Sequence, residues 1–174
     1  MVSRTLSRLA ARRSSASAPV KSEESSSRIS AAARTRAASG AQAPAAWREI
    51  RSPETYVGYG RADRFVSPGG LLHDKPKTYA SAPLNLNDWA LEGQWLDTRQ
   101  NARSLVAGGK IHYRFHARDL HLVLGSANGR PVRFKVTLDG AAPGRDAGVD
   151  VAADGSGVVR EQRLYQLTRQ KGPI

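Results

Sequence analysis

Alternating apolar and polar residues dominate the stretch from Lys110 to Leu138. Apolar residues at 111, 113, 115 and 117 alternate with His or Arg at the positions between them, and residues 132–138 repeat the pattern with Val, Phe, Val and Leu. Successive strand side chains point to opposite faces, so this period of two predicts strands with one apolar and one charged face. Residues 121–124 are nearly all apolar, which is typical of a strand covered on both sides.

Shorter patterns extend the β prediction on both sides of this stretch. Gly108-Gly109 and Asp139-Gly140 predict turns between strands. Roughly eight or nine short strands, separated by turn signals, predict an all-β, antiparallel β-sandwich that is jelly-roll-like. Outside the central stretch, the expected strands cover residues 84–87, 89–95, 102–105, 149–151, 157–160 and 163–169.

A change of composition near residue 49 divides the chain. Residues 1–48 are rich in Arg, Ser and Ala, with no acidic residue before Glu23. The segment has too few large apolar side chains to offset the loss of conformational entropy on ordering. We therefore expect a disordered basic tail. An organellar transit peptide and a misassigned start codon are the alternatives. Residues 49–83 predict an irregular lead-in packed on the β-sandwich module of residues 84–174 through Tyr56, Tyr59 and Phe65.

Charge and residue usage exclude several functions. The formal net charge is +12, and residues 1–50 hold 9 of the 27 basic and 3 of the 15 acidic residues. The remaining charges alternate along strands and no recognition motif accompanies them, so we expect no nucleic-acid partner. The absence of cysteine excludes disulfides, thiol catalysis and thiolate metal sites within this chain. No apolar run is long enough for a transmembrane segment.

The strand patterns offer two candidate ligand-binding surfaces. Exposed Trp89 and Trp95 would stack on sugar rings, but both share the parity of Leu91, which favours core positions. The second surface is the polar strand face. Its residues are His112, Arg114, His116, Arg133 and Lys135.

Metal sites are weaker alternatives. His112 and His116 lie about 13 Å apart on one strand, so a zinc site would need His121 to converge with them. Four aspartates beside turns could bind calcium, although Asp at turns is common for local hydrogen bonding. They are Asp119, Asp139, Asp150 and Asp154. We therefore predict no metal, cofactor or catalytic residue.

Six segments, taken together and in order, resemble one protein family. They cover residues 52–59, 86–95, 113–125, 134–140, 148–151 and 163–167, including Leu-Asn-Asp-Trp-Ala-Leu-Glu-Gly-Gln-Trp at 86–95 and Phe-Lys-Val-Thr-Leu-Asp-Gly at 134–140. The family is that of DipZ-type thiol–disulfide interchange and cytochrome c biogenesis proteins. In these, a DsbD-like membrane region precedes a thioredoxin-like domain and a C-terminal β-sandwich similar to carbohydrate-binding modules. The resemblance covers about residues 52–174.

The resemblance implies a non-catalytic, extracytoplasmic accessory module that binds a cell-envelope glycan or a substrate protein and positions a thioredoxin-like domain. The family's Cys-x-x-Cys motif has no counterpart here, because the chain has no cysteine. The resemblance also implies a closing strand after Ile174, so we expect a fragment whose neighbouring strand has an unpaired edge. A structural fragment without independent activity and a glycan-acting enzyme remain the alternatives.

Overall fold

The computed structural model describes residues 5–9 and 52–171 of the chain, and its regular elements there are almost all antiparallel strands. The larger sheet has the order β2-β3-β5-β1-β7-β8, with β4 paired to β3, and β6 and β9 form a second sheet. The strands are β1 (Thr5–Leu9), β2 (Pro76–Tyr79), β3 (Trp89–Asp97), β4 (Ala102–Ser104), β5 (Gly109–Tyr113), β6 (Asp119–Leu124), β7 (Val132–Val136), β8 (Ser156–Val159) and β9 (Arg163–Arg169). A 3₁₀ turn, η2, spans Gly144–Asp146.

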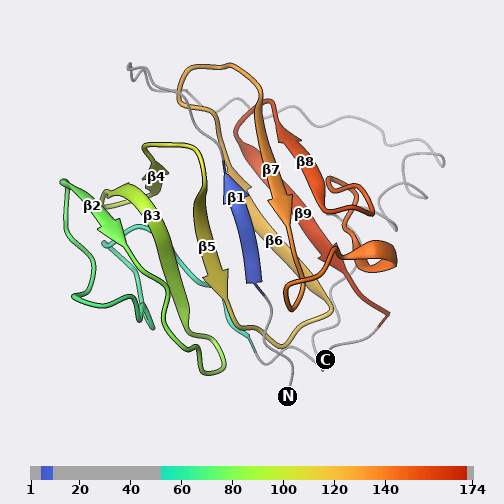
Figure 1. Cartoon of the computed structure of the whole chain (residues 1–174), viewed down its shortest axis with the longest axis horizontal. Coiled ribbons are helices and arrows are strands. Elements are labelled where there is room, and N and C mark those ends of the chain that lie inside the picture. Colours follow the sequence, from blue (N-terminus) through green and yellow to red (C-terminus); the bar gives the residue numbers. More distant parts are fainter. Residues whose placement is uncertain (1–4, 10–51, 172–174) are drawn as a thin grey trace, which may run out of the picture.

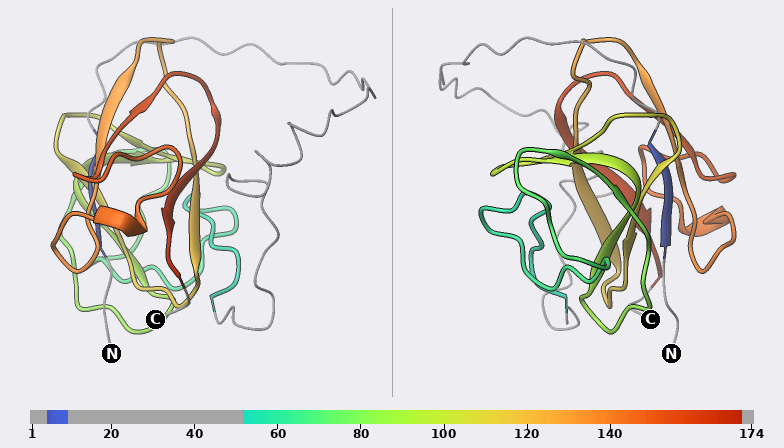
Figure 2. Two further views of the ribbon diagram at one scale, coloured as in Figure 1. Left: turned by 90° about the vertical axis from the view of Figure 1, so that its right-hand side faces the viewer. Right: turned by 60° about the vertical axis from the view of Figure 1, so that its left-hand side comes forward.

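The two sheets lie face to face, as Figures 1 and 2 show. One hydrophobic cluster fills the space between them and draws residues from β6, β7, β8 and β9. Its buried members are Leu124, Val132, Phe134, Val136, Val151, Val159, Tyr165 and Leu167. The prediction of an all-β, antiparallel sandwich is therefore confirmed.

A second cluster lies under the other half of the larger sheet. Trp89, Leu91 and Trp95 of β3 pack there with Tyr79 of β2. Phe65 of the lead-in contacts Trp89 with ring centroids 4.7 Å apart, and its backbone forms a parallel bridge with the same residue. The lead-in is thus anchored at Phe65, whereas Tyr56 and Tyr59 lie outside the hydrophobic clusters of the described residues.

Two of the expected strands are wrong. Residues 84–87 form a turn, because Asn87 has φ of 71° and the Asp88 carboxylate accepts a hydrogen bond from the Asn85 amide at 2.8 Å. Residues 149–151 form no strand. Asp150 is instead held against β9 by hydrogen bonds from Arg163 and from the Gln166 amide.

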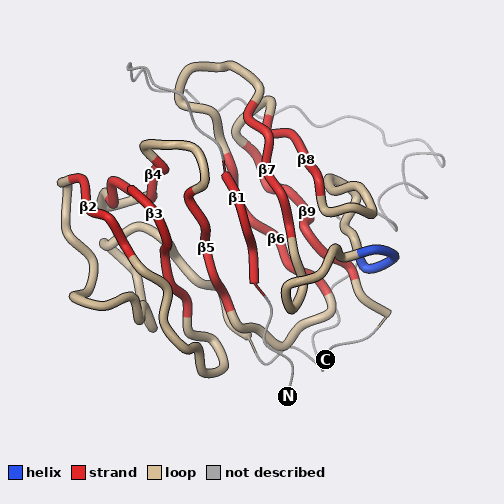
Figure 3. Tube along the Cα trace, in the orientation of Figure 1, coloured by secondary structure: helices blue, strands red, loops and turns tan. Residues whose placement is uncertain are grey.

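Strand β1 comes from the tail that the composition predicted to be disordered. It lies between β5 and β7 and pairs antiparallel with both, as the tube of Figure 3 shows. Without β1, β5 would pair only with β3, and β7 only with β8, so each would have one unpaired edge. A strand inserted between them satisfies the backbone N–H and C=O groups along both edges. The rest of the expected tail, residues 1–4 and 10–48, lies outside the described residues.

Strand β9 has backbone contacts on more than one side. It pairs with β6, and the Gly148 amide also donates to the Leu167 carbonyl at 3.1 Å. An isolated bridge joins Ala147 to Thr168. Strand β9 therefore bonds to the loop over 147–150 in addition to β6.

Candidate ligand-binding surface

The outward face of the larger sheet holds most of the candidate polar residues. Leu6 of β1 is paired with Ile111 of β5 and with Val136 of β7, which places these two residues in one row across the sheet. Ile111 packs against the Trp89 cluster and Val136 is fully buried, so both face the core. Their neighbours Lys110, His112 and Lys135 therefore project from the opposite face.

A carboxylate organises the β5 side of this face. Glu92 of β3 accepts hydrogen bonds from Lys110 Nζ at 2.5 Å and lies 2.9 Å from His112 Nε2. The register places Glu92 directly opposite Lys110. The Lys110 hydrogen bond, with a smaller contribution from His112, holds the pKa of Glu92 below its ordinary value. The charge of Lys110 is therefore partly neutralised within the protein.

The β7 side of the face is different. Arg133 and Lys135 are exposed and alternate with buried Val132, Phe134 and Val136. Among the residues that the structure describes, no hydrogen bond or ion pair engages either side chain. Lys135 contributes electrostatically to the lowered pKa of Asp154, and both cations remain exposed to a ligand in solution.

Arg114 and His116 do not join this group. Both follow the end of β5, and Arg114 Nη1 donates to the Leu84 carbonyl at 2.8 Å. The His116 amide donates to Ser52 Oγ at 2.8 Å. These contacts tie the lead-in and the 84–88 turn to the sheet. The Arg114 side chain therefore has a structural role, whereas the His116 contact involves its backbone alone.

The two tryptophans are core residues. Trp89 and Trp95 are 1% and 0% exposed. Their indole N–H groups donate to the carbonyls of Asp63 at 2.7 Å and Glu92 at 2.9 Å. Neither ring presents a face to solvent, so sugar stacking on these residues loses its structural basis.

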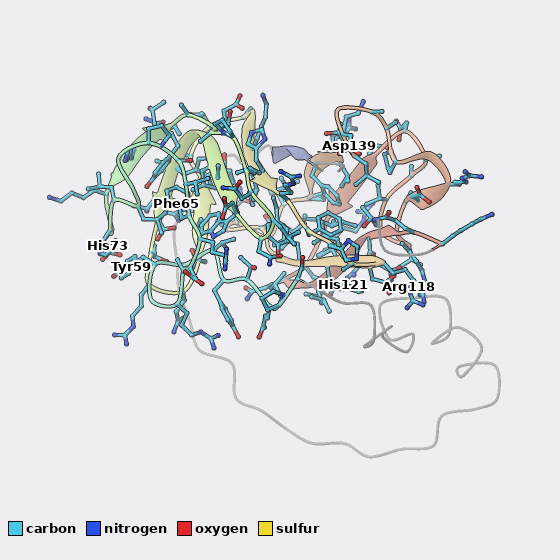
Figure 4. All side chains as sticks on the ribbon, turned by 90° about the horizontal axis from the view of Figure 1, so that it is seen from below. Tyr59, Phe65, His73, Arg118, His121 and Asp139 are labelled. Atoms are coloured by element: carbon cyan, nitrogen blue, oxygen red, sulfur yellow. The ribbon has the colours of Figure 1, made fainter. Side chains whose placement is uncertain are left out.

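The surface aromatic group that the sequence did not single out lies in the lead-in. Tyr59 stacks on His73 with ring centroids 3.9 Å apart, and its hydroxyl donates to Asp74 at 2.7 Å. Figure 4 shows Tyr59 and His73 side by side at one end of the molecule, far from His121 and Arg118. Nearby, the fully buried Asp97 accepts a hydrogen bond from the Tyr59 amide. Tyr59 lies 14 positions before His73 and 38 positions before Asp97, so no spacing pattern indicates the group.

A polar network crosses the second sheet at His121. Its ring Nε2 lies 3.4 Å from Gln166 Nε2, and burial lowers its pKa. Asp150 accepts two hydrogen bonds from Arg163, at 2.6 and 3.1 Å. Within residues 5–9 and 52–171, no group of three His, Cys, Asp or Glu side chains converges as a metal site would require. The zinc and calcium alternatives therefore find no support in this part of the chain.

Comparison with known proteins agrees with the resemblance in the sequence. Residues 52–174 match the family model described as the thioredoxin like C-terminal domain. The chain belongs to this family. It is also 32% identical over 80 residues to proteins called Protein DipZ from Mycobacterium bovis and Mycobacterium tuberculosis.

Those matches cover 45% of this chain but only 11% of each DipZ protein, so the chain corresponds to a small part of its relatives. No solved structure matches the chain. Among the described residues, no helix has the length and hydropathy of a membrane span.

Proposed function

We propose that this chain is a non-catalytic accessory module of a DipZ-like thiol–disulfide protein. In this role it binds an acidic ligand outside the cytoplasm, either a cell-envelope glycan or a substrate protein, and positions a thioredoxin-like domain. Because the chain has no cysteine, it supplies no thiol for the redox reaction itself, which supports an accessory, non-catalytic role. The family match and the likeness to DipZ support the redox context.

The observation on which the proposed ligand chemistry rests is the pair Arg133 and Lys135. Both are exposed on the outer face of the sheet, and β1 lies between them and the Lys110–Glu92–His112 group. Arginine binds carboxylate and phosphate oxygens through a planar fork, and lysine contributes a point charge. A face of this kind favours an acidic polymer over a neutral sugar, which would need exposed aromatic rings.

Reversing the charge of this pair is expected to abolish binding selectively. The double variant R133E/K135E should lose at least about tenfold in affinity for acidic polysaccharides, because two attractive contacts become repulsive. Binding to the unmodified chain should also weaken as salt is raised. Isothermal titration against a panel of soluble acidic and neutral polysaccharides measures both effects.

The control is a second double variant with the same change of charge. Arg99 and Arg145 are both exposed and lie in the β3–β4 connection and in η2, so R99E/R145E should bind within about twofold of the unmodified chain. An equal loss of affinity in both double variants would show that the effect depends on net charge and not on the position of the charges. If no polysaccharide binds, the same variants are titrated with the thioredoxin-like domain of a DipZ protein. Absence of binding to that domain as well would indicate a purely structural module.

A further inference from the structure

The larger sheet is held together by one short strand from a remote part of the sequence. Strand β5 otherwise pairs with β3, and β7 otherwise pairs with β8. Without β1, the sheet would separate into a β2-β3-β4-β5 part and a β7-β8 part. Figure 1 shows β1, in blue, between these two parts.

Each part has its own hydrophobic cluster. The Trp89 cluster lies under β2, β3 and β5, and the Phe134 cluster lies between β7, β8 and the second sheet. Strand β1 can therefore leave the space between β5 and β7 while both clusters keep their buried members. A strand edge on each side of the gap would then offer unpaired N–H and C=O groups to another extended segment.

The pairing of β1 in this gap is irregular. From Leu6 to Leu9 the strand advances three residues, whereas β5 advances two, from Ile111 to Gly109. Strand β7 also advances two, from Val136 to Phe134. Strand β1 thus has one residue too many, which in a sheet is a bulge that leaves part of the ladder unpaired.

The other ladders of the same sheet are regular. Strands β2 and β3, β3 and β5, and β7 and β8 each pair over four successive residues without a shift. The rows at Ile111–Val136 and Gly109–Phe134 are two residues apart on both sides of the gap. A regular strand with apolar residues at positions i and i+2 would match both rows.

We propose that the gap between β5 and β7 is an acceptor site for an extended polypeptide strand, that β1 is an exchangeable occupant, and that a better-matched segment of another protein displaces it. The partner runs antiparallel to β5 and β7, with apolar residues at alternate positions. Main-chain hydrogen bonds give such a complex its affinity, and the apolar rows give it register and specificity. A second copy of this chain would bring the same irregular strand and gain nothing over β1 in place, so the occupant is a foreign segment.

The connection to β1 is long enough for the exchange. Forty-two residues separate Leu9 from Ser52, where the described part of the chain resumes. A chain of that length reaches at most about 140 Å when extended. Release of β1 from the gap therefore requires no break in the sandwich.

The test uses the full chain and two fluorescent peptides. The first is Met1–Arg13, and the second is the same peptide without Ser7, which brings its two leucines to alternate positions. Anisotropy should show that the shortened peptide binds about tenfold more tightly, because it restores a regular ladder. A peptide with both leucines changed to aspartate should not bind.

A disulfide lock identifies the gap as the binding site. Thr5 is directly opposite His112 in the register of β1 and β5. Because the unmodified chain has no cysteine, the T5C/H112C variant can form a single intramolecular disulfide, which joins β1 to β5. Oxidation should abolish binding of the shortened peptide, and reduction should restore it. The control is T78C/Q94C, a pair of register partners on β2 and β3, whose oxidation should leave binding unchanged.

Two results would overturn the proposal. Equal binding of both leucine peptides, or binding by the oxidised T5C/H112C variant, would show that the peptide does not enter the gap. Disulfide-linked dimers of T5C/H112C formed without peptide would identify a second copy as the occupant.

Discussion

Replacing Trp89 by alanine is expected to lower the free energy of unfolding by about 3–5 kcal/mol. The ring is 1% exposed, contacts Phe65, and donates from its indole nitrogen to the Asp63 carbonyl. Its loss would leave a cavity under β3 and release the main anchor of the lead-in. Chemical denaturation followed by circular dichroism measures the change.

Two further variants separate burial from the chemistry of an aromatic ring. Trp89→Phe keeps a ring but loses the hydrogen bond to Asp63, so it should be destabilised by less than the alanine variant. Tyr56 lies outside the hydrophobic clusters and contacts Arg61, so Tyr56→Ala should cost less than about 1 kcal/mol. An alanine variant of Trp89 with unchanged stability would contradict the core position of this residue.

Replacing Asp97 by asparagine is expected to stabilise the protein at pH 8. The carboxyl is fully buried at the end of β3, and among the described residues its Oδ2 has no hydrogen-bond partner. Oδ1 accepts from the Tyr59 amide, while His73 and Asp74 are the charged or titratable groups that face it. Burial is the main reason that the pKa rises from 3.8 to about 6.

The sign of the pH dependence follows from this raised pKa. Between about pH 4 and pH 6 the native carboxyl binds a proton that the unfolded chain has released, so the free energy of unfolding falls as pH rises through this window. Above about pH 6 the carboxyl is ionised in the fold, and the free energy of unfolding stays lowered by the full cost of burying this charge. D97N should therefore gain on the order of 2 kcal/mol at pH 8 and almost nothing at pH 4.

The measurement is the difference in unfolding free energy between D97N and the unmodified chain at several pH values. Glu92 and Asp150 have pKa values lowered in the fold and act in the opposite direction at lower pH, and the difference cancels their contributions. D146N, at a partly exposed aspartate of η2, is the matched control and should change the free energy of unfolding by less than about 0.5 kcal/mol. A D97N variant less stable than the unmodified chain at pH 8 would contradict this explanation of the buried carboxyl.

Alternation predicted β3, β5 and β7, in which side chains of one parity pack on a hydrophobic cluster. Val132, Phe134 and Val136 face the cluster between the sheets, and this is why the period of two is visible in β7. The same pattern at residues 84–87 failed, since a local hydrogen bond between Asp88 and Asn85 makes a turn. Strand β2 was missed because it begins with Pro76 and has only four residues, a sequence that also suits a turn.

The candidate site was predicted in part. Parity placed His112 and Lys135 on polar strand faces, but only the pairing of β5 and β7 through β1 puts these two faces on one surface. Sequence spacing contains no information about that pairing, because β1 ends 100 positions before β5 begins. The Tyr59–His73 stack and the buried Asp97 depend on loop packing in the same way.

Amide hydrogen exchange with and without an acidic polysaccharide tests the central claim most directly. In the full chain, β3, β5 and β7 should exchange slowly because they form the middle of the larger sheet. The polysaccharide should slow exchange further in β5 and β7, and R133E/K135E should abolish that additional protection. Protection that is unchanged by every acidic and neutral polysaccharide, in a chain whose strands are otherwise protected, would contradict a glycan-binding module.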